Sequence, residues 1–239
     1  MHYISILSTL VTFFFVLAVF NRYRIRRGTH LLFWGLGLVF YGLGTLTEVL
    51  LSFSFSPLAL RFWYLSGAML TAAWLGQGTL FLLVRKRGVA SLLAGVLIVL
   101  TMLSLGLILS APLTPATEAY NTALPVSAQY KDILVRSGLI TLLTILLNIY
   151  GTIALVGGAI YSAYLFWRKR VFANRMLGNI LIAAGALMPA MAGSFIKAGL
   201  ADWLYVSEFL GVVLMYAGFM QATARQLTEA QPAVSATSN

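Results

Sequence analysis

Long apolar segments, separated by short polar connections, run through the whole chain. We predict seven of them, at residues 3–20, 31–53, 60–84, 89–109, 135–167, 175–198 and 203–224. A helix needs about 20 apolar residues to cross the hydrocarbon core of a bilayer, and strands with open edges are not tolerated in lipid. The pattern therefore predicts an all-α fold, an integral membrane bundle of seven transmembrane helices. The fifth segment is longer than one crossing requires, so we expect it to tilt or to project from the membrane.

The composition supports the same class of protein. Of the 239 residues, 60% are hydrophobic and 9% are charged, whereas soluble domains carry roughly 25% charged residues. A net charge of +10 is also a feature of nucleic-acid-binding proteins, but here the Lys and Arg residues stand in short bursts at the ends of apolar segments. Such bursts are typical of topology signals and of contacts with anionic lipid headgroups. We therefore exclude nucleic acid as a partner and predict that the lipid bilayer surrounds the chain.

The scarcity of reactive side chains excludes several kinds of site. The chain contains no cysteine, which excludes disulfides, thiol catalysis and cysteine-ligated metal clusters. Its two histidines, His2 and His30, stand at opposite ends of the first apolar segment, so a metal or haem site that uses both is not expected. No constellation of His, Cys or paired Asp residues is available for acid–base or metal chemistry. The sequence predicts a protein that is not an enzyme and needs no cofactor.

The distribution of Lys and Arg predicts the orientation. Twelve of the sixteen lie in the first, third and fifth connections or directly after the last segment: Arg22, Arg24, Arg26, Arg27, Arg85, Lys86, Arg87, Arg168, Lys169, Arg170, Arg175 and Arg225. The other four are Arg61, Lys131, Arg136 and Lys197. Because cytoplasmic connections carry the excess of positive charge, we expect the N-terminus outside and the C-terminus in the cytoplasm. The predicted location is the plasma (cytoplasmic) membrane, which the chain crosses several times.

Two units are predicted along the chain. Residues 1–224 form the seven-helix membrane domain, and residues 225–239, rich in Gln, Ser, Thr and Ala, form a short disordered cytoplasmic tail. The first segment has no basic residue before it and no small-residue cleavage site after it, so we expect it to be retained rather than removed as a signal peptide. The outer connection at 110–134 contains Pro112, Pro115 and Pro125, which indicates an irregular surface loop.

Two carboxylates inside the predicted spans are the main candidates for a site. Glu48 lies 17 residues after Leu31, about 26 Å along a helix, and Glu208 lies about 8 Å from the outer end of the last span. Both are therefore expected at one depth near the outer face. They either pair with cations at the outer helix ends, or meet interfacial water, or line an outward-facing pocket for a small polar or cationic ligand. The cations, and one further acid, at this level are Arg61, Arg136, Lys197 and Asp202.

Polar and aromatic stripes lie beside these carboxylates. The second span carries such a stripe on one face, formed by Trp34, Tyr41, Thr45, Glu48 and Ser52. The fifth span carries another, formed by Thr141, Thr144, Asn148 and Thr152, with Asn148 near mid-membrane. Both stripes fit a ligand pocket, and both equally fit hydrogen bonding between helices. The ligand-binding residues predicted from the sequence are Glu48, Glu208, Tyr41, Trp34 and Asn148.

Several other positions are interpreted as packing contacts. Gln77 is expected to join helices. The rings of Trp63 and Trp74 are expected to pack against glycine notches, or else to line an apolar cavity. The ridge of small residues Ala154, Gly158 and Ser162 permits close helix approach, either within the chain or in a dimer. Pro189 should kink the sixth span, because proline removes a backbone hydrogen bond.

The overall pattern resembles the seven-span membrane domain at the N-terminus of some bacterial sensor histidine kinases. The resemblance rests on the stretch from Trp34 to Glu48, on LRFWYLSGAMLTAAWL at residues 60–75, and on LGNILIAAGALMPAMAG at residues 177–193. In that family the membrane domain is thought to receive a signal and to pass it to a kinase. The resemblance implies a sensor whose signalling half is a separate protein, since no kinase is attached here. It transfers no role to any individual residue.

The leading functional hypothesis is a receptor-like protein or an accessory subunit of a membrane complex, without enzymatic activity. Its ligand pocket would open outward near Glu48 and Glu208, and its partner would be another membrane or cytoplasmic protein. The alternative is a small transporter or channel subunit. A transporter needs a polar path through the midplane of the membrane, whereas a receptor needs only an outward cavity above a closed, dry inner half.

Overall fold

The computed structural model describes residues 2–84, 86, 88–169, 173–191 and 203–224. In these ranges the chain is helical, and the only strand-like pairing is an isolated bridge between Leu113 and Leu134. The elements are α1 (His2–Arg26), α2 (Thr29–Phe53), α3 (Pro57–Phe62), η1 (Trp63–Leu70), α4 (Thr71–Leu83), α5 (Val89–Ser110), η2 (Pro115–Ala119), α6 (Val126–Ile133), α7 (Gly138–Thr152), η3 (Ile153–Gly157), α8 (Gly158–Lys169), α9 (Ala173–Ala190) and α11 (Trp203–Thr223).

The prediction of an all-α membrane protein is confirmed. Five helical segments in the described part are long and apolar enough to cross a bilayer: Tyr3–Arg26, Thr29–Phe53, Val89–Ser110, Gly138–Lys169 and Trp203–Thr223. The predicted span at 60–84 is also helical, and it runs through α3, η1 and α4 without a break. The predicted span at 175–198 is helical in α9, and its last residues lie outside the described ranges, as does the predicted tail at 225–239.

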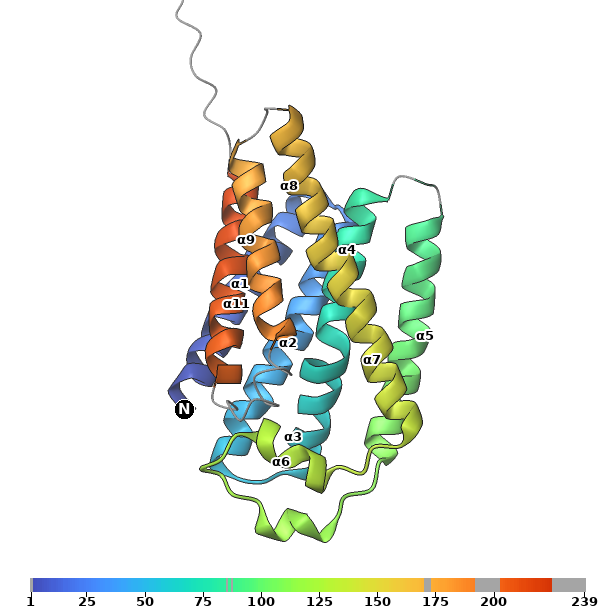
Figure 1. The fold of residues 1–239 in the computed structure, drawn as a ribbon, viewed down its shortest axis with the longest axis vertical. Coiled ribbons are helices and arrows are strands. Elements are labelled where there is room, and N and C mark those ends of the chain that lie inside the picture. The colour runs from blue at the N-terminus through green and yellow to red at the C-terminus, as the bar shows by residue number, and fades with distance from the viewer. Residues whose placement is uncertain (1, 85, 87, 170–172, 192–202, 225–239) are drawn as a thin grey trace, which may run out of the picture.

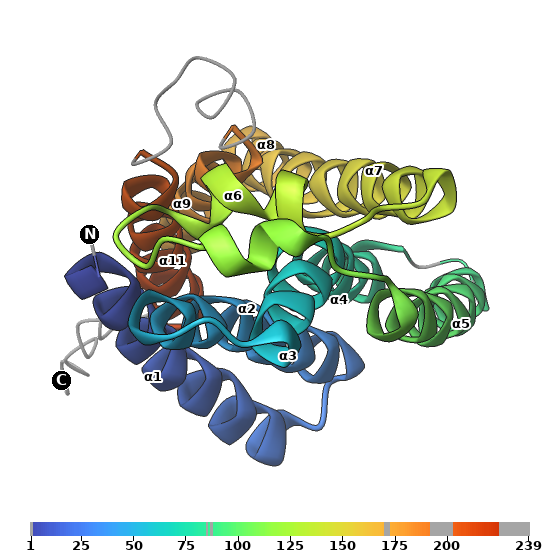
Figure 2. The same cartoon turned by 90° about the horizontal axis from the view of Figure 1, so that it is seen from below.

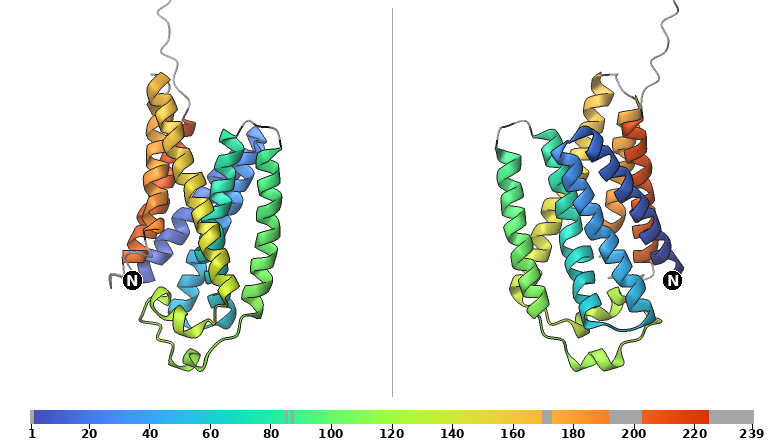
Figure 3. Two further views of the ribbon diagram at one scale, coloured as in Figure 1. Left: turned by 45° about the vertical axis from the view of Figure 1, so that its right-hand side comes forward. Right: turned by 180° about the vertical axis from the view of Figure 1, so that it is seen from behind.

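The long helices stand side by side with one connection closing an end of the bundle (Figure 1). The continuous segment α3–η1–α4 packs against α2, α5 and α7, while α11 packs against α9 and α1. Figure 3 shows α5 at one edge of the bundle and α8 extending past its neighbours. The expectation that the fifth span tilts or projects from the membrane stays a prediction. The connections that carry Arg22–27, Lys86 and Arg168–169 lie at the end opposite the 110–137 connection.

Glycines permit the closest helix contacts. Helices α9 and α11 meet through two pairs, Gly178 with Gly218 and Gly185 with Gly211, each pair separated from the next by seven residues. A Cβ atom on Gly178 would lie 2.6 Å from the carbonyl oxygen of Gly218, and one on Gly185 would lie 2.6 Å from that of Gly211. Two backbones can approach this closely only where side chains are absent. This seam was not anticipated from the sequence.

The small-residue ridge of the fifth span packs inside the chain. A Cβ on Gly76 of α4 would approach the Gly151 carbonyl oxygen to 2.8 Å and the Ala154 side chain to 3.0 Å. Gly158 lies against the side chains of Thr79 and Leu83. The ridge therefore serves the contact between α4 and the α7–η3–α8 segment, which answers the question of dimer or internal contact for these residues.

The polar residue Gln77 joins three helices, as predicted. Its Nε2 donates to the Ala90 carbonyl oxygen of α5 at 2.8 Å, and its Oε1 accepts from the Tyr150 hydroxyl of α7. The prediction that the rings of Trp63 and Trp74 pack on glycine notches is wrong for Gly67 and Gly78, because Gly67 lies against Gly44. Gly78 makes room for the indole of Trp34, whereas Trp74 donates to Thr101 at 3.1 Å.

The connection between α5 and α7, residues 111–137, is an ordered segment that we call the cover, so the prediction of an irregular loop is wrong. Pro115 begins η2 and Pro125 caps α6, since proline is well tolerated at the first turn of a helix. The two ends of the connection are tied by the bonds Thr114 N to Ile133 O (2.9 Å) and Val135 N to Pro112 O (3.1 Å). Viewed along the bundle, α6 lies across its end, over the space between α11 and α3 (Figure 2).

Candidate functional site

A cavity of about 380 Å³ lies inside the bundle, beneath the cover. It separates two apolar clusters. One is built on α3, η1, α5, α7 and α6, and the other on α1, α9 and α11, while α2 contributes to both. The side chains around the cavity come from α2, η1, α4, α6, α7, η3, α9 and α11: Tyr41, Gly44, Thr45, Glu48, Trp63, Gly67, Ala68, Thr71, Ala72, Leu75, Ser127, Tyr130, Asn148, Thr152, Leu155, Val156, Ala186, Pro189, Leu204, Glu208 and Met215.

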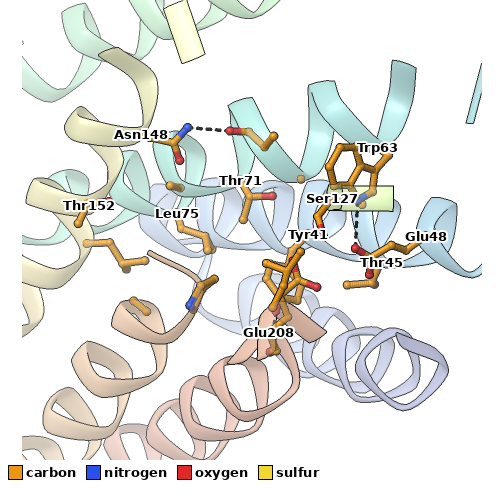
Figure 4. A pocket seen from close by; sticks show the side chains of 18 of the residues that line it. Tyr41, Thr45, Glu48, Trp63, Thr71, Leu75, Ser127, Asn148, Thr152 and Glu208 are labelled. Carbon is orange, nitrogen blue, oxygen red and sulfur yellow. Dashed lines mark hydrogen bonds between the residues drawn. The ribbon is translucent and has the colours of Figure 1, made fainter. Parts of the chain in front are cut away.

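Glu48 is held in the cavity wall by neutral donors. Its side chain is only 4% exposed. The indole Nε1 of Trp63 donates to Oε1 at 3.1 Å, and the hydroxyl of Ser5 donates to Oε2 at 3.3 Å. Figure 4 shows the bond from Trp63 at one side of the cavity. Two hydrogen bonds from two different helices hold this carboxyl group in place. Neither donor carries a positive charge.

Glu208 faces the same end of the cavity from α11. Figure 4 places it beside Tyr41, whose hydroxyl donates to the Glu208 main-chain carbonyl at 2.7 Å. The carboxyl groups of Glu208 and Glu48 are close enough to interact electrostatically. Both carboxyl groups therefore lie near the end of the bundle that the cover closes, and the placement of this end at the outer face stays a prediction. Together with Tyr41 they form what we call the acidic end of the cavity.

The arginines expected to pair with these carboxylates have other partners. Nη2 of Arg61 donates to the Ala111 carbonyl oxygen at 2.8 Å, and the Arg136 guanidinium lies 5.1 Å from the centre of the Tyr130 ring. Both arginines thus stabilise the cover rather than the acidic end. Lys197 and Asp202 lie outside the described residues. Besides the bonds from Trp63 and Ser5, the Glu48 side chain has a hydrogen bond with the Glu208 side chain.

The opposite end of the cavity is neutral. Asn148 donates through Nδ2 to the carbonyl oxygens of Ala68 (2.7 Å) and Thr144 (2.8 Å), which uses both amide hydrogens and leaves its oxygen as an acceptor. Thr152 and Leu155 complete this end. Asn148 therefore joins α7 to η1 and lines the cavity, so both interpretations made from the sequence apply to it.

Two π-helical segments line the cavity. Trp63, Gly67 and Ala68 belong to η1, and Leu155 and Val156 belong to η3. Widened turns of this kind are rare and occur frequently at functional sites. These two segments were not predicted from the sequence.

Residues of the cover also form part of the cavity wall. Tyr130 of α6 packs against the rings of Trp63 (5.2 Å) and Tyr64 (5.6 Å), and its pKa is raised by burial, against the opposing charge of Arg136. Burial, with a smaller effect of the Glu48 charge, raises the pKa of Tyr120 to about 12. Both phenols therefore remain neutral in the physiological range. Ser127, also on α6, is 1% exposed and its hydroxyl has no hydrogen-bond partner.

Four of the five predicted site residues thus meet at one cavity, and the fifth does not. Trp34 lies nearer the end of the bundle opposite the cover, which carries the basic connections and which we call the basic end. There its Nε1 donates to Thr79 at 3.2 Å, and its ring lies 6.3 Å from that of Phe219. Sequence reasoning did not assign Ser127 and Tyr130 to a site, and it considered Trp63 only as a ring that packs on glycine or lines an apolar cavity. Trp63 had a detectable signal, because it follows Glu48 by 15 residues across a short connection, but the two α6 residues had none.

No protein-family model, no curated protein and no solved structure matches this chain. The resemblance to the membrane domain of sensor histidine kinases therefore stays a prediction. Among the described residues, no three His, Cys, Asp or Glu side chains gather as a metal site. The cavity has an acidic end, a neutral end and an aromatic cover.

Proposed function

We propose that this protein is a receptor-like subunit or an accessory subunit of a membrane complex, and that it binds a small molecule in the cavity between Glu48 and Asn148. It is not an enzyme, it crosses the plasma membrane seven times, and its basic end lies in the cytoplasm. The observation that carries the proposal is the position of the cavity, which lies beneath the cover at the end opposite the basic connections. A signal from this cavity would pass to a separate membrane or cytoplasmic protein.

The packing below the cavity favours a receptor over a transporter. Toward the basic end the interior is filled by apolar side chains, among them Phe15 (1% exposed) and Val19 (0%). Phe15 stacks on Tyr216 with ring centres 5.1 Å apart. Among the polar side chains at this level, Gln77 and Thr79 are used in bonds between helices. A transporter requires a polar path or a broken helix pair at the midplane, and this packing supplies neither within the described residues.

The decisive test is transport. The purified protein is reconstituted in proteoliposomes, and flux of H⁺, Na⁺ and small organic amines is measured against empty liposomes and against the Glu48→Gln variant. We expect no flux above that of empty liposomes. Flux that Glu48→Gln abolishes would replace the receptor by the alternative, a small transporter or channel subunit.

The orientation gives a second, independent prediction. Because the chain contains no cysteine, single cysteines at Ala116 in the cover and at Ser235 in the tail can be labelled without background. A membrane-impermeant maleimide should label Ala116→Cys in intact cells and Ser235→Cys only after the cells are permeabilised. Labelling of both from the same side of intact cells would contradict an odd number of crossings, and with it the outward-facing cavity.

A further inference from the structure

We infer that the cavity binds a small primary amine, with the ammonium group held between Glu48 and Glu208 beneath Ser127. This inference rests on the proposed function and specifies its ligand. Three features carry it: the charge of the acidic end, the unpaired hydroxyl of Ser127, and the absence of cationic residues among the described lining.

Among the described residues that line the cavity, none carries a positive charge that would balance the two carboxyl groups of the acidic end. Two carboxyl groups that interact with each other stand in the low-dielectric interior of the bundle, where like charges repel strongly. Glu48 accepts from an indole and a hydroxyl and shares a hydrogen bond with Glu208, while Arg61 and Arg136 contact the cover. Ionisable groups at such depth pair with an opposite charge or take up a proton. A bound cation would supply the missing charge.

Ser127 provides an independent indication of a ligand. Its hydroxyl is buried, has no partner, and belongs to a residue that lines the cavity at its acidic end (Figure 4). A buried polar group without a partner is costly, so such groups are normally satisfied. The Ser127 oxygen and one oxygen from each carboxyl group make three acceptors. A primary ammonium has three N–H donors, one for each of these three acceptors. A quaternary ammonium has no N–H donor.

The remainder of the lining defines the rest of the ligand. The described lining contains no Lys, Arg or His, so nothing there would balance a carboxylate or phosphate. Leu75, Leu155 and Val156 offer apolar contact beyond the acidic end, and the Asn148 oxygen offers one more acceptor. A volume of about 380 Å³ is far larger than a bare metal ion and fits an amine with a compact apolar body. Primary amines should therefore bind in preference to amino acids, alcohols and Na⁺.

The test compares amines with their isosteric alcohols. Butylammonium, cyclohexylammonium, phenethylammonium and tryptammonium are each titrated beside the corresponding alcohol into the full chain in detergent. Phenylalanine and NaCl serve as zwitterionic and metal-ion probes. Binding is followed by the quenching of tryptophan fluorescence, to which Trp63 at the cavity wall contributes, and by the shift in melting temperature. We expect at least one amine to bind ten times more tightly than its alcohol, with phenylalanine and Na⁺ showing no saturable effect.

Variants identify the site. Glu208→Gln should weaken amine binding about 30-fold or more, the expected consequence of removing one partner of a buried charge pair. Glu118→Gln removes an exposed acid of the cover and should leave binding unchanged. Ala186→Phe fills the cavity and should block amines and alcohols alike, which separates binding in the cavity from partitioning into the micelle.

Two results would overturn the inference. If the alcohols bind as tightly as the amines and Ala186→Phe blocks both, the cavity is a ligand site but not one for cations, and the proposed function stands. If no probe binds wild-type protein in a manner that Ala186→Phe prevents, the cation site and the ligand-binding function both fail. Flux in proteoliposomes would overturn the receptor role while leaving an amine site intact.

Discussion

Leucine at position 151 is expected to prevent the helices from packing. Gly151 lies on α7 where the chain touches the backbone of α4. A Cβ atom at this position would overlap the carbonyl group of Ala72 and come within 2.5 Å of the Ala73 amide nitrogen. Flexible side chains can move aside, but here the neighbour is backbone in the middle of a buried helix. Overpacking a core costs about 1–3 kcal/mol when side chains can adjust. We expect Gly151→Leu to cost more than about 4 kcal/mol, because the two helices must separate.

The measurement is the free energy of unfolding, obtained by SDS titration in mixed micelles. Gly106→Leu is the matched control, because Gly106 also lies within a long helix and has no atom within 4 Å of a Cβ placed on it. The control measures the cost or gain of the glycine replacement itself, which is about 1 kcal/mol in favour of the larger residue. Equal stability of the two variants would show that α4 and α7 are not in backbone contact.

The positions of the apolar helices followed from the sequence because lipid allows few alternatives. One helix boundary differs from the prediction, and hydrogen bonding explains the difference. The first span was predicted to end at residue 20, yet α1 continues to Arg26. Arginine is a good helix former, and the Arg22 Nη1 reaches the Thr223 carbonyl oxygen at 3.5 Å, at the end of α11. A helix can therefore continue past the hydrocarbon core where its basic side chains find partners.

The candidate site was predictable only as far as helical phase determines it. Tyr41 and Glu48 are seven residues apart, so they lie on one face of α2, about 10 Å apart along the helix. Both line the cavity. Trp34 shares the same face but stands two further turns away, about 10 Å deeper, where α4 instead of the cavity meets it. Helical phase correctly predicted the face of α2 on which Trp34 lies. Its position along the helix determines which residues it contacts.

The cover could not be predicted, because its contacts connect distant parts of the chain. Tyr120 donates to the Leu51 carbonyl oxygen at 3.2 Å across 69 residues, and its ring lies 4.9 Å from that of Phe55. Neither contact has a local sequence signal. The pairing of carboxylates with arginines was wrong for a related reason. The sequence predicts the depth of a charged residue in the membrane. Whether two residues at one depth are in contact depends on how their helices pack against each other.

Replacing Glu48 with leucine is expected to destabilise the bundle by about 2 kcal/mol. The carboxyl group accepts from Trp63 of η1 and Ser5 of α1, so its removal leaves two donors unpaired in an apolar interior. Each such group costs about 1–3 kcal/mol, offset in part by the desolvation that an uncharged side chain avoids. Glu48→Gln should cost less than about 1 kcal/mol, because the amide oxygen still accepts from the indole and the Ser5 hydroxyl can accept in turn.

A double-mutant cycle with Trp63→Phe isolates the bond itself. If Trp63 Nε1 donates to Glu48 as the geometry indicates, the double variant should lose less stability than the two single variants together, by on the order of 1 kcal/mol. Hydrogen bonds between membrane helices average about 0.6 kcal/mol and reach about 1.7 in such cycles, and a carboxylate acceptor belongs at the upper end. Trp63→Phe with Glu118→Gln is the control cycle, since Glu118 is exposed on the cover, and its effects should add. Additivity in the Glu48 cycle would show that the indole and the carboxyl group are not bonded, and that the wall of the cavity is held by packing alone.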